Sequence, residues 1–252
     1  MAKIYKPKSL QELKELVNDK SVHLGDIDTS LITDMTELFK DSKRKNFDGL
    51  ETWDTSNVTT MKGMFYRAKY FNHPIGDWDV SKVEDMTFMF CEAPAFNQPL
   101  EKWNVSNVRC MNSMFAWAYS FNQPIERWDV SNVYNMKAML YFAKSFNQPL
   151  NAWNVSKVYT ITCISGGAKS FNQPLDKWDT SGIQEMAYAF FECYEFNQNI
   201  DSWDTSEVTY MDGMFDGAKN FNQPLNSWKT GNVKFMRRMF QGASSFNQPL
   251  DK

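Results

Sequence analysis

The amino-acid sequence predicts an α/β repeat solenoid: a curved stack of about nine coils, each 25 residues long. Three columns of residues predict this architecture, because each of them recurs at that interval. A repeat of this length cannot bury its own apolar face, so neighbouring coils must stack. The columns consist of tryptophan (Trp53, Trp78, Trp103, Trp128, Trp153, Trp178, Trp203, Trp228), asparagine (Asn72, Asn97, Asn122, Asn147, Asn172, Asn197, Asn222, Asn247) and leucine or isoleucine (Leu50, Ile75, Leu100, Ile125, Leu150, Leu175, Ile200, Leu225, Leu250).

Each coil is expected to contain a short parallel strand, as residues 71–95 illustrate. Ile75, Trp78 and Val80 match the spacing L-x-x-L-x-L, which places Trp78 and Val80 on one face of a strand. Parallel strands stack about 4.8 Å apart, whereas helix axes need about 8–10 Å. Strands on one side and helices on the other therefore predict an arc with the strands inside. A mostly-β right-handed solenoid is the alternative architecture.

A cap and a short helix are expected after the strand. Ser81 is a favourable N-cap residue, and Glu84 three residues later completes a capping box. The methionine column of these helices, from Met61 to Met236, is interpreted as core rather than as a metal-binding stripe. Four apolar residues of one coil share one helical face: Val83, Met86, Phe90 and Ala93.

The stretch Phe96-Asn97-Gln98-Pro99-Leu100 and its copies are predicted to turn the chain towards the next strand. Phe96 would fill the core, and Pro99 fixes the backbone without needing a donor partner. A turn inside a solenoid has backbone groups that no ladder satisfies. Stacked Asn97-type side chains are expected to satisfy them from coil to coil. We favour this structural role over an exposed amide ladder that binds sugar or ice.

The two ends of the chain are expected to differ. Residues 1–23 are predicted to form an N-terminal cap, because Ser9 can cap an amphipathic helix. Residues 24–252 form the single solenoid domain, and Ile27 stands where later coils carry tryptophan. The residues of the helix that would cover the first coil are Leu10, Leu13 and Val17.

The last coil lacks a polar cap in this sequence. The chain reaches Phe246 and the final FNQPL copy just where a new strand would begin. An uncapped solenoid end exposes apolar side chains and unpaired edges, which favour association. We therefore expect either a homodimer through the C-terminal coil or a longer natural chain.

Composition limits the classes of partner. The chain contains 27 basic and 30 acidic residues, which give a net charge of −3. This balance argues against nucleic acid or an anionic membrane as the main partner, since both require a basic surface. No apolar run approaches the ~20 residues needed to cross a bilayer, so no membrane insertion is expected. The N-terminal stretch lacks the apolar core of a secretory signal, which fits a cytoplasmic protein or one whose leader was removed.

Residues suited to catalysis or metal binding are few. Four cysteines lack paired or metal-ligand spacing and are interpreted as free thiols, and the two histidines have no reactive companions nearby. The sequence therefore predicts no enzyme activity, no cofactor and no metal. The cysteines are Cys91, Cys110, Cys163 and Cys193.

An acidic column follows the predicted strands. Its carboxylates are expected to favour the positive end of the following helix and to accept backbone hydrogen bonds. A ladder that binds calcium or a basic partner is the alternative. The column comprises Asp28, Asp54, Asp79, Asp129, Asp179 and Asp204.

The variable positions of the predicted helices carry an excess of aromatic residues, concentrated in the middle coils. The repeat does not dictate these positions, and contiguous exposed aromatic residues often mark binding patches. We therefore expect a protein partner to bind there; packing of some rings between neighbouring helices is the alternative. The predicted partner-binding residues are Trp117, Tyr134, Tyr141, Phe142, Tyr159, Tyr188 and Phe191, with Tyr66 and Phe88 on the same side.

One coil breaks the pattern. Residues 158–168 carry isoleucine at the methionine positions and Ser165 at the phenylalanine position, followed by Gly166 and Gly167. Isoleucine and paired glycines weaken a helix, so we expect an irregular wall here. This irregularity is either sequence drift or a functional notch beside the aromatic residues.

The repeated unit FNQPLxxWDVSNVxxMxxMFxxA resembles the BspA-like leucine-rich-repeat family, and more closely its short-repeat bacterial surface proteins. The resemblance covers about residues 24–252. It implies a leucine-rich-repeat-like solenoid on a bacterial cell surface, associated with adhesion or host contact, and no catalytic residues. The leading expectation is therefore a non-catalytic protein-interaction scaffold. The second is a self-assembling structural protein that stacks end to end through its uncapped C-terminal coil.

Overall fold

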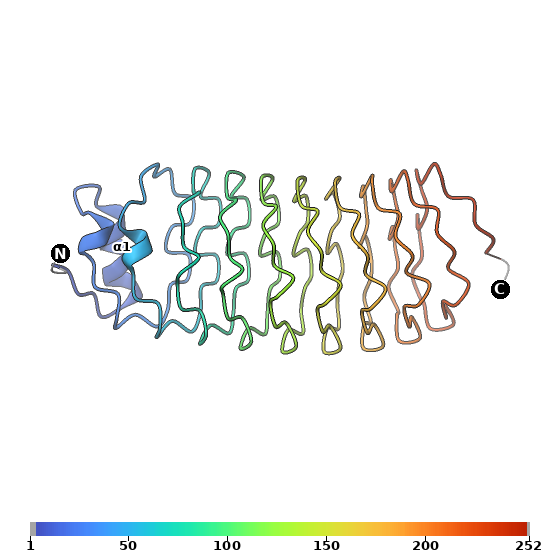
Figure 1. Cartoon of the computed structure of the whole chain (residues 1–252), viewed down its shortest axis with the longest axis horizontal. Coiled ribbons are helices and arrows are strands. Elements are labelled where there is room, and N and C mark those ends of the chain that lie inside the picture. The colour runs from blue at the N-terminus through green and yellow to red at the C-terminus, as the bar shows by residue number, and fades with distance from the viewer. Residues whose placement is uncertain (1–3, 251–252) are drawn as a thin grey trace.

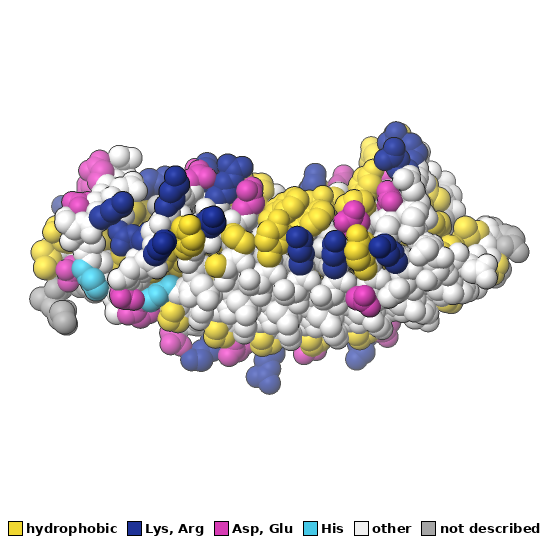
Figure 2. Space-filling view, turned by 90° about the horizontal axis from the view of Figure 1, so that it is seen from above, with side chains coloured by type: hydrophobic (Ala, Val, Ile, Leu, Met, Phe, Trp, Pro, Cys, Tyr) yellow, Lys and Arg dark blue, Asp and Glu magenta, His cyan; other side chains and the backbone are white. Residues whose placement is uncertain are grey.

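The protein is a solenoid of stacked coils in a computed structural model that describes residues 4–250. Figure 1 shows the coils side by side along the long axis, with the two termini at opposite ends. Seen from above, the body is elongated, and hydrophobic and charged side chains follow its length (Figure 2). The outer limits of the predicted cap and solenoid, at 1 and 252, lie outside the described residues.

Helices are confined to the N-terminal region of the described chain. They are α1 (Leu10–Asn18), η1 (Leu24–Asp26) and η2 (Leu50–Thr52). The prediction of a helix in each coil is wrong, because the corresponding segments are successive turns. The arc expected from helices on one side and strands on the other therefore has no basis in this structure.

The turns replace the helix because they let neighbouring coils bond to each other. In one coil, Met89 N–H donates to the Met86 carbonyl and Ala93 N–H to the Phe90 carbonyl. Phe88 and Glu92 are the third residues of these two turns. Both have positive φ, as that position of a type II turn requires. Between these turn bonds, Phe88 N–H and Phe90 N–H donate to the next coil. A helix would direct these groups along its own axis and would need about 8–10 Å of spacing.

The β-structure lies in a different place from the predicted strand. Ile75–Trp78 and Val80–Val83 each close a turn, whereas the parallel contact between coils is one residue wide and passes through Asp85. The alternative of a mostly-β solenoid is closer to the structure than the α/β prediction, because the described coils beyond η2 lack helices. It is still not correct in detail, since each coil contributes a single bridge residue rather than a strand. The column of bridge residues is Asp34, Thr60, Asp85, Cys110, Asn135, Thr160, Glu185, Tyr210 and Phe235.

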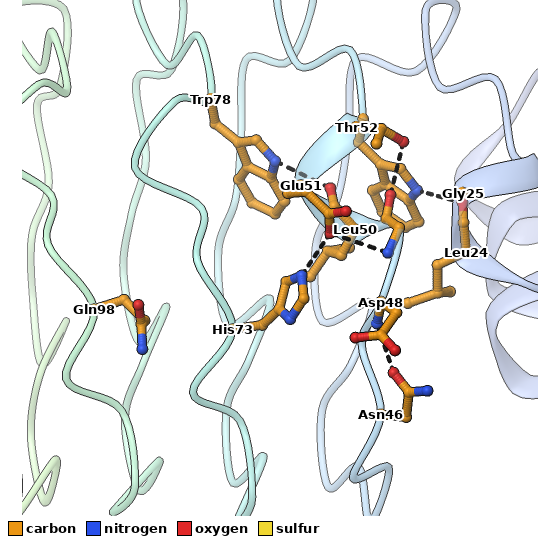
Figure 3. A network of polar contacts seen from close by, with 12 residues as sticks. Leu24, Gly25, Asn46, Asp48, Leu50, Glu51, Thr52, His73, Trp78 and Gln98 are labelled. Atoms are coloured by element: carbon orange, nitrogen blue, oxygen red, sulfur yellow. Dashed lines mark hydrogen bonds and ion pairs between the residues drawn. The ribbon is translucent and has the colours of Figure 1, made fainter. Parts of the chain in front are cut away.

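Stacked aromatic columns fill the core. Phe96 and Phe121 stack with ring centroids 5.9 Å apart, and Trp103 and Trp128 are 6.4 Å apart. Each indole of the tryptophan column also donates its Nε1–H to a carbonyl of the preceding coil, as Trp78 does to Leu50 at 3.2 Å (Figure 3). The predicted inward direction of the tryptophans is confirmed from Trp53 to Trp203, and the methionine column is core as far as Met211.

The amide ladder predicted for the FNQPL stretch is confirmed. Asn97 N–H donates to Asn72 Oδ1 at 2.9 Å, and the Gln98 side chain donates to the same oxygen at 3.1 Å. The link repeats through every later coil to Asn247. These bonds satisfy turn backbone that has no sheet partner, which is the role expected of the asparagine column.

The two ends of the described chain differ in packing. Ser9 caps α1 by accepting from Glu12 N–H, and Leu13 and Val17 are buried in the same hydrophobic cluster as the coils. At the other end, Met236 is 39% exposed and Leu250 is 61% exposed. The equivalent residues of the middle coils are buried, because each of those coils has a neighbour on both sides.

Candidate functional site

The seven predicted partner-binding residues form three separate groups rather than one continuous patch. Trp117, Tyr141 and Phe142 contact one another, and we call these three residues the aromatic cluster. Tyr134 and Tyr159 stack on each other at 6.2 Å. The third group is formed by Tyr188 and Phe191, whose rings are perpendicular at 6.1 Å.

The aromatic cluster is the most tightly packed of the three groups. Trp117 stacks on Phe142 with centroids 4.3 Å apart and rings within 1° of parallel. Tyr141 lies perpendicular to both, at 5.5 Å from Trp117 and 4.7 Å from Phe142. All three side chains are half-buried, and burial raises the pKa of Tyr141. The cluster therefore presents a rigid apolar surface to solvent rather than three independent rings.

The coil that breaks the repeat forms the floor beneath this cluster. Gly167 has a φ of +74°, and a Cβ there would lie 2.7 Å from the Phe142 ring. A Cβ on Gly166 would lie 3.1 Å from the Tyr141 ring. The inter-coil bonds persist nevertheless, since Phe142 N–H donates to the Gly166 carbonyl at 2.7 Å. The segment predicted to be irregular thus keeps its hydrogen bonds to the preceding coil. Its small residues form the surface on which the Tyr141 and Phe142 rings lie, and we call this surface the glycine floor.

An open depression of about 560 Å³ adjoins the cluster. Two of its lining residues, Arg67 and Glu92, form an ion pair at 3.2 Å. Trp117 and Tyr119 form the apolar wall, with their rings 6.2 Å apart. The depression is lined by Arg67, Lys69, Glu92, Pro94, Trp117 and Tyr119.

The other two aromatic groups are less enclosed. Tyr134 is 47% exposed and Tyr159 is 39% exposed, so this stacked pair stands out from the bridge side of the coils. The Tyr188 ring covers Gly213, where a Cβ would lie 2.2 Å from it. Tyr188 and Phe191 are half-buried. For this group, the alternative in which rings pack against neighbouring segments is closer than an exposed patch.

The acidic column closes turns rather than capping helices. Asp79 accepts from Ser81 N–H at 2.9 Å, and hydrogen bonds from Ser81 lower the pKa of Asp79. Asp129 makes the same contact with Ser131, with the same effect on its pKa. The expected helix dipole is absent because no helix follows. Among residues 4–250, no group of three acidic, histidine or cysteine side chains could hold a metal ion.

All four cysteines are free thiols, as the sequence predicts. Burial raises the pKa of the Cys91 and Cys193 thiols to about 12 and that of Cys163 to about 11. Cys193 donates to the Ser165 carbonyl at 2.8 Å, where the phenylalanine column is interrupted. Thiols with such raised pKa values are poor nucleophiles at neutral pH.

Several surface residues beside the cluster were not expected from the sequence. Tyr119 lies between Trp117 and Lys144, whose ammonium group is 4.2 Å from the Tyr119 ring centroid. Following the 25-residue column through Tyr119, as was done for tryptophan, would have found that it is rich in lysine and tyrosine from Lys69 to Lys219.

The fold defines a repeat protein of the solenoid class. The sequence profile of a family described as "Mycoplasma protein of unknown function, DUF285" matches residues 8–118, 76–177 and 163–252. The chain therefore belongs to this family. The match supports a repeat family of bacterial proteins without carrying the BspA-like name.

Two further observations accompany the family assignment. A search of curated proteins gave no match. Within the described part of the chain, every helix is too short or too polar to cross a bilayer.

Proposed function

We propose that this protein is a non-catalytic interaction scaffold that binds a protein partner through the aromatic cluster. The observation that carries the proposal is the parallel stack of Trp117 on Phe142, half-exposed on coils that are bonded on both sides. Large aromatic side chains dominate the energetics of many interfaces. Rings that are already fixed lose little conformational freedom on association, so less of their contact energy is spent on ordering.

The depression beside the cluster supports a partner of mixed polarity. Its lining combines the aromatic rings of Trp117 and Tyr119 with the Arg67–Glu92 ion pair. Protein interfaces commonly combine an apolar centre with a polar rim. The raised pKa values of three thiols disfavour nucleophilic chemistry and support a scaffold without a reaction.

The setting of this interaction is part of the proposal. The resemblance of the repeat to short-repeat bacterial surface proteins supports contact with a host or with another surface protein. The partner is a folded protein or an exposed segment that can insert an apolar side chain beside Trp117.

A matched pair of variants tests the proposal. Trp117→Ser should abolish capture of the partner by the immobilised chain, whereas Tyr210→Ser should leave capture unchanged. Tyr210 is a suitable control because it is 41% exposed and stacks on Phe235 in a different part of the surface. The unfolding midpoint of each variant reports whether the fold is intact. Equal capture by both variants, with both folded, would exclude the aromatic cluster as the binding surface.

A second candidate function is self-assembly through the C-terminal coil. Trp228, Phe240 and Phe246 are only partly buried, whereas the corresponding rings of the middle coils are almost fully buried. A shallow apolar depression lies between Trp228 and Phe240, with Met236 and Leu250 beside it. Covering this surface with a second copy would remove it from water, which is the main driving force for association.

Light scattering across concentration tests self-assembly. A chain of this sequence should form a dimer or a longer stack, and the double change Phe240→Asp and Phe246→Asp should return it to the monomer. The aromatic-cluster variant Trp117→Ser should assemble normally, which separates this function from partner binding. A monomer at high concentration would rule out the second candidate.

A further inference from the structure

One tryptophan differs from all the others in the surroundings of its indole N–H. The eight tryptophans of the 25-residue column each donate Nε1–H to a carbonyl of the preceding coil. The ninth is Trp117, whose Nε1–H has no hydrogen-bond partner among residues 4–250. Every buried side-chain nitrogen or oxygen atom of the described chain has a partner, so this donor is open to solvent. It can therefore donate to a ligand.

The depression beside the aromatic cluster opens on one face of Trp117 and one face of Tyr119. The following coil covers the other faces: Phe142 stacks on Trp117 at 4.3 Å, and the Lys144 ammonium group lies 4.2 Å from the Tyr119 ring centroid. The depression is lined only by the coil of these two rings and the two coils before it, so it lies on the uncovered side. The two rings meet at 74° and form a corner with Pro94 beside them. This corner fits flat apolar groups.

The lining supplies hydrogen-bond donors but no free carboxylate. Glu92 is its one acidic side chain, and the two carboxylate oxygens already accept from Arg67 and from the Tyr66 hydroxyl group. The Pro94 carbonyl accepts from Ser120 N–H at 3.2 Å. A ligand rich in N–H or O–H groups would leave some of them without an acceptor here, which costs free energy on binding. The depression therefore favours a ligand with acceptors, apolar faces and few donors.

We propose that this depression binds a proline-rich segment of the protein partner in the polyproline II conformation, an inference that rests on the proposed function of the aromatic cluster. Proline has a flat apolar ring and no backbone N–H. The carbonyl groups of a polyproline II helix make no internal hydrogen bonds, so they are free to accept from Trp117 Nε1–H. Grooves lined by aromatic residues recognise such segments because their conformation is fixed before they bind.

The same features disfavour other occupants of the depression. An extended strand presents unpaired N–H groups as well as carbonyl groups along its edge. An α-helix uses most of its carbonyl groups internally, so few would reach the indole N–H. A sugar brings several hydroxyl donors, whereas the Glu92 carboxylate is already engaged. An acidic peptide without proline would leave the faces of Trp117 and Tyr119 without an apolar partner.

The charges of the depression select an acidic residue near the prolines. Its lining carries two cations, Arg67 and Lys69, and Lys69 forms no ion pair among residues 4–250. These cations lie two coils before the rings, which is about 9.6 Å for coils about 4.8 Å apart. One turn of polyproline II spans three residues and about 9.3 Å. With a proline at the rings, a glutamate three positions away therefore meets Lys69.

Calorimetry with the full chain and an oligoproline that carries a glutamate at each end tests this proposal. Binding is expected, and Trp117→Phe should weaken it roughly fivefold, because an aromatic ring remains and the N–H donor is lost. Tyr119→Ser should weaken it roughly tenfold, since one face of the corner is removed. The matched control Tyr194→Ser alters the same column three coils away and should bind like the unaltered protein.

A second pair of variants tests the acidic residue. The unaltered protein should bind the peptide with glutamate ends more tightly than the same peptide with glutamine ends. Lys69→Gln should remove this preference. Lys219→Gln, the same change in the same column but outside the depression, should keep it. A preference that survived Lys69→Gln would overturn this placement of the segment.

Three results would overturn the proposal as a whole. They are no binding of the oligoproline, equal weakening by Tyr119→Ser and Tyr194→Ser, and tighter binding of polyglutamate or a neutral cello-oligosaccharide with the same dependence on Trp117. The last result would make an acidic peptide or a sugar the ligand. If the oligoproline fails while Trp117→Ser still abolishes capture of the partner, the proposed function stands and only the proline-rich segment is excluded.

Discussion

A central coil and the last coil each carry a residue of the tryptophan column that makes the same hydrogen bond to the preceding coil, yet these two tryptophans differ in burial. Trp128 and Trp228 each donate Nε1–H to a carbonyl of the preceding coil at 3.0 Å. Trp128 is 3% exposed, whereas Trp228 is only partly buried. The difference shows that part of the burial of each tryptophan comes from the coil that follows it. Stability in this fold is therefore a property of neighbouring pairs.

The largest expected effect comes from removing a central indole. Trp128→Ala should cost about 3–5 kcal/mol of unfolding free energy, because it leaves a cavity between coils packed on both sides. Trp228→Ala should cost no more than about 2 kcal/mol, since its site is already open on one side. Urea unfolding followed by circular dichroism measures both. Equal losses would mean that the following coil adds nothing.

Breaking the amide ladder should have the next largest effect. Asn147 Oδ1 accepts from Asn172 N–H and from the Gln173 side chain, so Asn147→Ala leaves two donors without this acceptor. The expected loss is about 1–3 kcal/mol. Asn247→Ala is the control, because no donor to its side chain lies among the described residues. A similar loss in both variants would contradict a stabilising ladder.

The glycine floor of the aromatic cluster provides a third comparison. Gly167→Ala would place a Cβ against the Phe142 ring at a φ of +74°, which should cost about 1–3 kcal/mol. It should also displace the Trp117–Phe142 stack and change the near-ultraviolet circular dichroism. Gly231→Ala meets nothing within 4 Å and should be neutral within about 0.5 kcal/mol. An unchanged spectrum in the first variant would show that the added methyl group does not displace the stack.

The smallest expected effect is on acid stability. The folded-state pKa values of Asp79 and Asp129 are lowered, so their stabilising contribution is complete above the unfolded value of about 3.9 and is lost as pH falls through the folded value. Asn104 makes the same turn contact with Ser106 but does not titrate. Asp79→Asn with Asp129→Asn should therefore flatten the acid limb of a stability profile slightly. If the acid limb of the profile kept its steepness, protonation of Asp79 and Asp129 would not affect the free energy of unfolding.

The sequence predicted which side chains face inward, because the residue types at buried positions recur every 25 residues. The 25-residue columns correctly placed the tryptophans in the core and Asn97 in a ladder. The backbone was predicted wrongly between Val83 and Ala93, since apolar spacing of three and four residues fits consecutive turns as well as a helix. Local pattern cannot show that Phe88 N–H bonds to the next coil. That choice depends on stacking between segments far apart in the chain.

The candidate surface was less predictable than the core. The sequence correctly singled out Trp117, Tyr141 and Phe142 as aromatic residues that the repeat does not require. Its seven-residue patch nevertheless divides into three groups, because facing was assigned from a helix that does not exist. Gly166 and Gly167 appeared only as helix-weakening residues, and their role as a floor depends on rings from the preceding coil.

The amide and indole hydrogen bonds all run in the same direction along the chain, and this direction bears on the order in which the coils fold. In each of these links the donor belongs to the later coil and the acceptor to the earlier one, as with Asn97 and Asn72 or Trp78 and Leu50. A ribosome releases the N-terminal coils first. Each finished coil therefore displays oriented acceptors before the segment that donates to them has emerged. The growing protein serves as its own template, and synthesis and folding can advance together, one coil at a time.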